Sequence, residues 1–74
     1  MDKLDLHSIN YSDARKLIIS FVEDRYNKNI EAEFITGYSE GMRNVVKEVL
    51  GEYKIECQIG GVMGVNMAII RAIL

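Results

Sequence analysis

The short segment Leu4-Asp5-Leu6-His7 places the single histidine of the chain two positions after an aspartate. In an extended strand alternate side chains share a face, so Asp5 and His7 would project together from one side. Leu4 and Leu6 would enter the core. A carboxylate beside an imidazole can orient a general base or supply two metal ligands. A histidine that hydrogen-bonds locally at a strand end explains the same pattern, so both interpretations stay open.

A second candidate site is the glycine-containing loop that starts at Thr36 and leads into an expected helix. Free backbone amides at a helix start favour an anion, and Gly37 and Gly41 permit its close approach. Thr36 and the loop amides, Ser39 included, would then hold the predicted ligand, a phosphate. Arg43 would add a charge-assisted contact. Spacing alone favours the alternative, in which Thr36, Gly37 and Ser39 only form a turn and cap the helix.

Metal and thiol chemistry have little support in the sequence. Asp5 and His7 could supply two ligands to a divalent metal, but Glu40 is the one obvious further ligand and no dense acidic cluster lies near. We therefore expect no intrinsic metal ion and no other cofactor. Cys57 is the single cysteine, which excludes an internal disulfide and a cysteine-based zinc site within one chain. A buried and inert thiol is expected there.

The elements that must position these residues follow from the spacing of apolar side chains. Four strands are predicted, at residues 4–7, 30–35, 55–59 and 65–73. The last is too apolar to alternate, as expected for a strand covered on both sides. Helical spacing predicts one helix after the N-cap Asn10 and another from Met42 to Tyr53. The apolar stripe of the first helix comprises Ala14, Leu17, Ile18, Phe21, Val22 and Tyr26.

The order strand, helix, strand, helix, strand, strand predicts an α/β fold, a two-layer βαβαββ sandwich with a four-stranded mixed sheet. Both helices would cover one face of the sheet. Parallel pairing of the first two strands would bring His7 toward the loop that begins at Thr36. The other sheet face would be partly exposed, which in a small domain invites ligand binding or association. Glycines at residues 60–64 would connect the last two strands as a hairpin.

The composition predicts one folded domain over residues 1–74, with 49% hydrophobic residues, 27% charged residues and no proline. The formal net charge of -2 and the pI of about 5.3 argue against a strongly basic nucleic-acid footprint. Nucleic-acid binding must therefore come from a local site. Because no apolar run resembles a secretory signal or could span a bilayer, we expect a cytoplasmic protein without membrane contact.

These motifs resemble the Smr (small MutS-related) domain family over nearly the whole chain. Leu4-Asp5-Leu6-His7 is similar to the opening LDLH motif of the family. Ile35-Thr36-Gly37 followed by Gly41-Met42-Arg43 is similar to its HGxG or TGxG loop, and Gly60-Gly61 to Gly64-Val65 resembles its late glycine turn. The resemblance implies a fold similar to the C-terminal domain of bacterial initiation factor three. It also implies DNA or RNA binding, with nicking endonuclease activity in some members.

Three positions depart from the family pattern. Ser8 replaces the glycine usual after the LDLH motif, and Ser39 replaces the second glycine of the loop. Thr36 stands where many members have histidine. Asp5 and His7 match the opening motif, and Thr36 with Gly37 matches the loop motif.

Two hypotheses follow. In the first, an Smr-like domain binds the backbone of DNA or RNA and hydrolyses phosphodiesters. There, His7 is the base or phosphate contact, Asp5 orients it, and Arg43 neutralises the phosphate. The second, motivated by the acidic pI and the loop departures, is a noncatalytic protein-interaction or assembly module. It would keep the Smr fold and bind a protein partner or another copy through the exposed sheet face.

Overall fold

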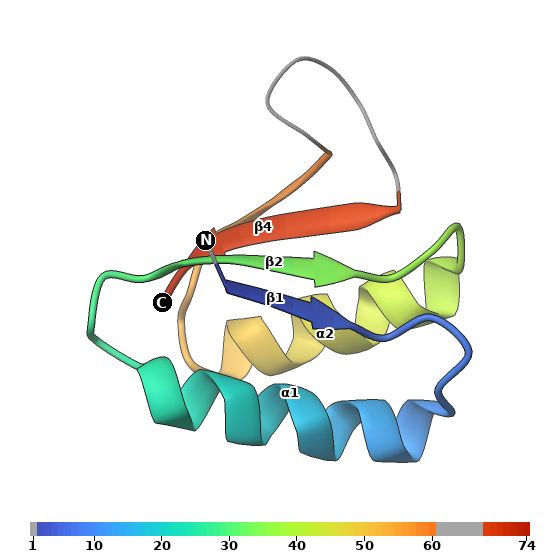
Figure 1. Ribbon diagram of the computed structural model, residues 1–74, viewed down its shortest axis with the longest axis horizontal. Helices are drawn as coiled ribbons and strands as arrows, with labels where there is room; N and C mark the ends of the chain where they lie inside the picture. Colours follow the sequence, from blue (N-terminus) through green and yellow to red (C-terminus); the bar gives the residue numbers. More distant parts are fainter. Residues whose placement is uncertain (1, 61–67) are drawn as a thin grey trace.

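The computed structural model describes residues 2–60 and 68–74, and its elements follow the predicted order (Figure 1). They are β1 (Asp2–Asp5), α1 (Tyr11–Arg25), β2 (Glu31–Ile35), α2 (Glu40–Glu52), β3 (Cys57–Ile59) and β4 (Ile69–Ile73). The strands form one sheet in the order β1-β2-β4-β3. β1 and β2 are parallel, whereas β4 is antiparallel to both of its neighbours. The expected α/β architecture with a four-stranded mixed sheet is therefore confirmed.

Both helices begin at side-chain caps that the sequence supplies. Asn10 is the N-cap of α1, and its Oδ1 accepts a hydrogen bond from the amide of Asp13 at 2.8 Å. Ser39 is the N-cap of α2, and its Oγ accepts from the amide of Met42 at 3.1 Å. Such caps satisfy amides that have no partner inside the helix, and each stabilises by about 1 kcal/mol. The predicted cap at Asn10 is confirmed.

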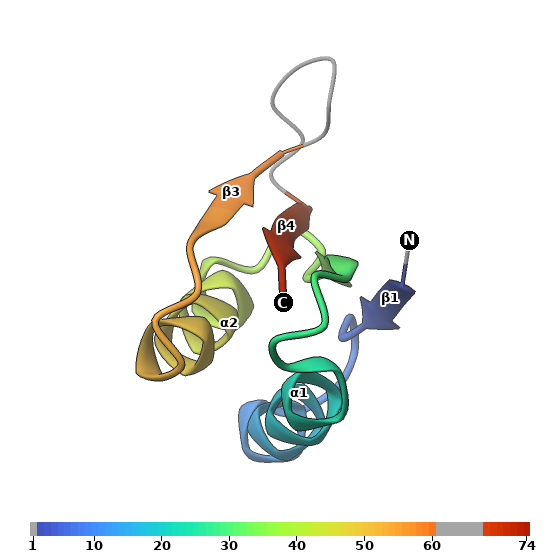
Figure 2. The same ribbon diagram turned by 90° about the vertical axis from the view of Figure 1, so that its left-hand side faces the viewer.

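The core lies between the helices and one face of the sheet (Figure 2). Alternate strand residues enter it, which is why Ala32 and Phe34 of β2 are fully buried. Phe34 meets Phe21 of α1 edge to face, with ring centroids 5.4 Å apart. Arg25 at the end of α1 lies over the Phe21 ring and pairs with Asp2 of β1 at 2.7 Å. This contact ties the start of β1 to the end of α1.

Two predictions about the helical stripe of α1 are wrong. Leu17 is 42% exposed and Tyr26 is 48% exposed. Arg15 bonds Glu48 and Glu52 of α2, so α2 lies along the Arg15 side of α1. Leu17 projects from the opposite flank of the helix, away from that neighbour. Tyr26 lies past the end of α1 and packs its ring against Tyr53, with centroids 5.6 Å apart.

The prediction that the last strand is covered on both faces is also wrong. In β4, Ile70 and Ala72 are buried toward the helices, whereas Ile73 is 60% exposed on the opposite face. That face has no second layer among residues 2–60 and 68–74, and Arg71 projects there to pair with Glu31 at 2.7 Å. Residues 61–67, which include most of the predicted glycine hairpin and the start of the predicted strand, lie outside the described residues.

Candidate functional site

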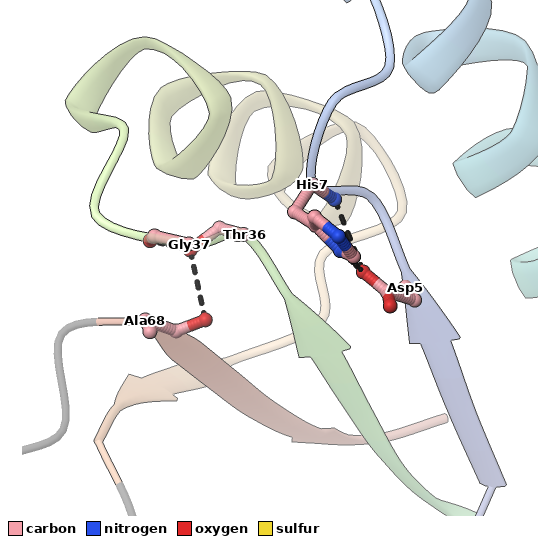
Figure 3. A network of polar contacts seen from close by, with 5 residues as sticks. All are labelled: Asp5, His7, Thr36, Gly37 and Ala68. Atoms are coloured by element: carbon pink, nitrogen blue, oxygen red, sulfur yellow. Dashed lines mark hydrogen bonds and ion pairs between the residues drawn. The ribbon is translucent and has the colours of Figure 1, made fainter.

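Asp5 and His7 form a hydrogen-bonded pair at the carboxyl end of β1, on the sheet face opposite the helices (Figure 3). His7 Nδ1 lies 2.5 Å from Asp5 Oδ1, and the His7 backbone amide donates to the same oxygen at 3.1 Å. Both side chains are exposed, whereas Leu6 between them is fully buried. The predicted pairing of these two side chains is confirmed, but β1 ends at Asp5 and His7 lies in the turn that follows, so the pair is held by these local hydrogen bonds and not by alternation along a strand.

The chemistry of this pair fixes the arrangement of protons. An ionised carboxylate only accepts hydrogen bonds, so His7 Nδ1 carries the hydrogen that Asp5 accepts. In the neutral ring, Nε2 then keeps an unshared electron pair and can accept a proton. The hydrogen bond from the His7 ring, followed by that from the His7 amide, lowers the pKa of the Asp5 carboxyl. Asp5 is therefore the permanently charged member of the pair at neutral pH.

The chain turns sharply after the pair because Ser8 adopts a left-handed backbone conformation. Its φ is 65°, a region that costs a residue with a Cβ about 1–2 kcal/mol. Next to this turn, the Leu6 amide donates to the Ile35 carbonyl at 2.8 Å, which extends the β1–β2 pairing beyond Asp5. A glycine at position 8 would adopt this turn without strain.

The loop after β2 passes directly beside His7. A Cβ added to Gly37 would lie 3.8 Å from the Cβ of His7, and Gly37 itself has a φ of 65°. The predicted approach of His7 to this loop is therefore confirmed. Among the described residues, the amides of Gly37 and Tyr38 donate to no backbone carbonyl or side chain. These two amides are consequently available to an anion placed beside the imidazole.

Thr36 is committed to the protein itself. Its side chain is 2% exposed, and its hydroxyl lies 2.8 Å from the Gly37 carbonyl and 3.1 Å from the Ala68 carbonyl (Figure 3). The Thr36 amide also donates to the Ala68 carbonyl, at 2.8 Å. Thr36 therefore anchors the loop to the start of β4 and presents no hydroxyl to a ligand. The sequence offered no signal for Ala68 as its partner.

Ser39 and Gly41 form the start of α2, where they meet Tyr11. Ser39 Oγ, besides capping the Met42 amide, lies 3.2 Å from the Tyr11 hydroxyl. A Cβ on Gly41 would overlap that hydroxyl, so only glycine leaves room for the Tyr11 ring in this position. The turn-and-cap interpretation is thus confirmed for Ser39. Tyr11 is 53% exposed, and the sequence did not identify it as a neighbour of this loop.

Arg43 lies on the part of α2 that is next to the β3 edge of the sheet. It lines a shallow hollow together with Lys47 of α2 and Ile59 of β3. β3 is the sheet edge opposite β1, which carries Asp5. The structure therefore brings together Asp5, His7 and Gly37 at one edge, with Ser39 and Gly41 further along the same loop, and places Arg43 apart from them.

Other candidate chemistry lies away from this edge. Within residues 2–60 and 68–74, no three His, Cys, Asp or Glu side chains are grouped to hold a metal ion. Cys57 is half-buried beside a larger hollow that also includes Arg71 and Glu31. Burial raises the pKa of the Cys57 thiol, and the positive charge of Lys47 opposes that shift more weakly.

Comparisons with models of known protein families, with curated proteins and with solved structures find no match to this chain. Across the part of the chain that the structure describes, neither helix has the length and apolar character required to cross a membrane.

Proposed function

We propose that this chain is an Smr-like domain that binds the phosphate backbone of DNA or RNA at the carboxyl edge of β1 and β2 and cleaves it. The observation that carries the proposal is the exposed Asp5–His7 pair, positioned beside Gly37 at the parallel-strand edge. Edges of this kind are where open α/β sheets bind their ligands. As part of the same proposal, the fold of this chain is similar to that of the C-terminal domain of bacterial initiation factor three.

In this mechanism His7 is the general base. Nε2 takes a proton from a water molecule, whose oxygen then forms a bond to phosphorus. The bond between phosphorus and one sugar oxygen breaks, and that oxygen takes a proton from solvent. Asp5 holds the imidazole in the required tautomer and stabilises the imidazolium that forms. The chemistry needs no oxidant or reductant.

In the proposed mechanism, the loop beside His7 binds the phosphate. The amides of Gly37 and Tyr38 would donate to the charged oxygens as the charge on the phosphoryl group rises in the transition state. Ser39 and Gly41 act as positioning residues, because they form the first turn of α2 and hold the loop against Tyr11. Thr36 is likewise a positioning residue through Ala68.

The test uses supercoiled plasmid DNA and a structured RNA, each incubated with wild type, His7→Ala and Asp5→Asn. Lys28→Ala, in the exposed loop after α1, is the matched surface control. We expect wild type and the control to cleave at the same rate. His7→Ala should lose cleavage by about 100-fold or more, and Asp5→Asn should lose less. Circular dichroism checks that both proteins are folded. Equal cleavage by folded wild type and folded His7→Ala would then remove His7 from the mechanism.

A noncatalytic assembly module is the second candidate function, and the uncovered sheet face favours it. Ile73 is 60% exposed on this face, close to the ion pair of Arg71 with Glu31. A second copy of the chain that covers these residues would bury exposed apolar surface. Such burial would stabilise a domain whose single small core supplies only modest stability. Light scattering that shows a stable dimer, together with no salt-sensitive binding of nucleic acid, would favour this function over cleavage.

A further inference from the structure

Tyr38 is the most exposed large apolar side chain among the described residues, at 82%. The other three tyrosines each use their hydroxyl within the protein. Tyr11 bonds Ser39, Tyr26 donates to the Tyr53 carbonyl, and Tyr53 donates to Glu23. Within the described part of the chain, Tyr38 has no hydrogen bond and no ring contact. Because the Tyr38 ring is exposed to solvent and makes no such contact, it is available to a ligand.

The position of Tyr38 in the loop is fixed from both sides. Gly37, the residue before it, passes beside His7 in a left-handed conformation, and Ser39, the residue after it, caps α2 and contacts Tyr11. The ring therefore projects from a short segment that is anchored at each end. In a nucleic acid the base lies within one sugar of its phosphate. A phosphate at His7 would thus carry its base within reach of this ring.

The charge of the site determines which form of nucleic acid suits it. The chain carries a formal net charge of -2, and Arg43 lines the hollow on the β3 side. Duplex binding depends mainly on several cations that contact phosphates along both strands. Single strands can instead gain affinity from bases that stack on aromatic side chains, whatever the sequence. A duplex keeps its bases stacked inside, where a loop tyrosine does not reach them.

We propose that Tyr38 stacks on an unpaired base next to the phosphate that His7 contacts, so that this chain selects single-stranded or unpaired nucleic acid. The proposal rests on the function proposed above and names its substrate class. Tyr38 is a specificity-determining residue in this account, whereas His7 and Asp5 carry the chemistry. The hydroxyl of Tyr38 has no required part, because stacking uses only the ring face.

The test measures fluorescence anisotropy of a labelled pyrimidine-rich strand, made as DNA and as RNA, alone and annealed to its complement. The variants are Tyr38→Phe, which keeps the ring, and Tyr38→Ala, which removes it. Leu17→Ala, an exposed apolar residue on α1, is the control. We expect Tyr38→Ala to weaken single-strand binding about tenfold, Tyr38→Phe to change it by about twofold or less, and the duplex to bind more weakly than the single strand.

The outcomes separate this inference from the proposed function. Unchanged single-strand binding by Tyr38→Ala, or duplex binding as tight as single-strand binding, would overturn the stacking role. If His7→Ala still abolishes cleavage in that case, the proposed function stands without it. No binding of either form by wild type would overturn both. The DNA and RNA arms show which backbone the site prefers.

Discussion

A single oxygen of Asp5, Oδ1, accepts hydrogen bonds from both the ring and the backbone amide of His7, at 2.5 and 3.1 Å. The backbone bond closes a local turn, and the ring bond fixes the orientation of the imidazole. Asp5 therefore has one role in the fold and another in the proposed chemistry.

The first prediction concerns the stability that the Asp5–His7 pair contributes as the pH is lowered. Since His7 lowers the pKa of Asp5 in the folded state, the pair contributes stability that is complete above the unfolded-state pKa of about 3.9. That contribution is lost as pH falls through the lower, folded-state pKa. NMR titration of the Asp5 side-chain carboxyl carbon should give a lower midpoint in the folded protein than in the protein unfolded in urea, where the hydrogen bonds to His7 are lost. A midpoint in the folded protein at or above that in urea would contradict the hydrogen-bonded pair.

The second prediction concerns the left-handed turn at Ser8. Ser8→Gly should raise the free energy of unfolding by about 1 kcal/mol, because glycine adopts a φ of 65° without the Cβ penalty. Ser20→Gly, inside α1, is the matched control and should lower it by about 0.5 kcal/mol. Urea denaturation measures both. A loss of stability in Ser8→Gly would show that the serine side chain has a role at this turn.

The third prediction concerns the contact of Gly41 with Tyr11. Gly41→Ala should displace the Tyr11 ring and break its hydrogen bond to Ser39, which costs about 1 kcal/mol and offsets the helical gain of alanine. In a Tyr11→Ala background, the same substitution should stabilise by up to about 1 kcal/mol. A double-mutant cycle in urea measures the coupling. Equal effects of Gly41→Ala in both backgrounds would show that the ring and the glycine do not interact.

The fourth prediction concerns Cys57. Because burial raises the pKa of its thiol, the reactive thiolate is scarce near neutral pH. Alkylation by iodoacetamide should therefore be several-fold slower in the native protein than in urea, where burial is lost. Mass spectrometry follows the modification. Native and unfolded protein reacting at the same rate would show that Cys57 is accessible and unperturbed.

The sequence was sufficient to predict contacts that depend on local periodicity. The spacing of Asp5 and His7 predicts that they pair, although His7 lies in the turn after β1. The alternation of Ala32 and Phe34 defines the buried face of β2. The parallel pairing that brings Gly37 beside His7 follows from the strand–helix–strand order. These features depend on a few neighbouring residues or on simple topology.

Contacts between distant segments could not be predicted in the same way. Thr36 is polar and follows a strand, yet it is buried. Its hydroxyl donates a hydrogen bond to the carbonyl oxygen of Ala68, which is 32 residues later in the chain. Tyr11 contacts Ser39, which is 28 residues later in the chain. Arg43 lies beside Ile59 because β3 forms the edge of the sheet next to α2. Periodicity assigns a residue to a face, whereas the identity of its partner is decided by tertiary packing.

The central claim is that nucleic acid binds at the edge where His7 and Gly37 meet. An NMR titration of isotope-labelled protein with a short single strand tests it most directly, since each backbone amide reports separately. The account predicts that the largest shift changes fall on His7, Gly37 and Tyr38 and that they weaken with added salt. Changes confined to Arg71 and Ile73 on the open sheet face, or no changes at all, would contradict it.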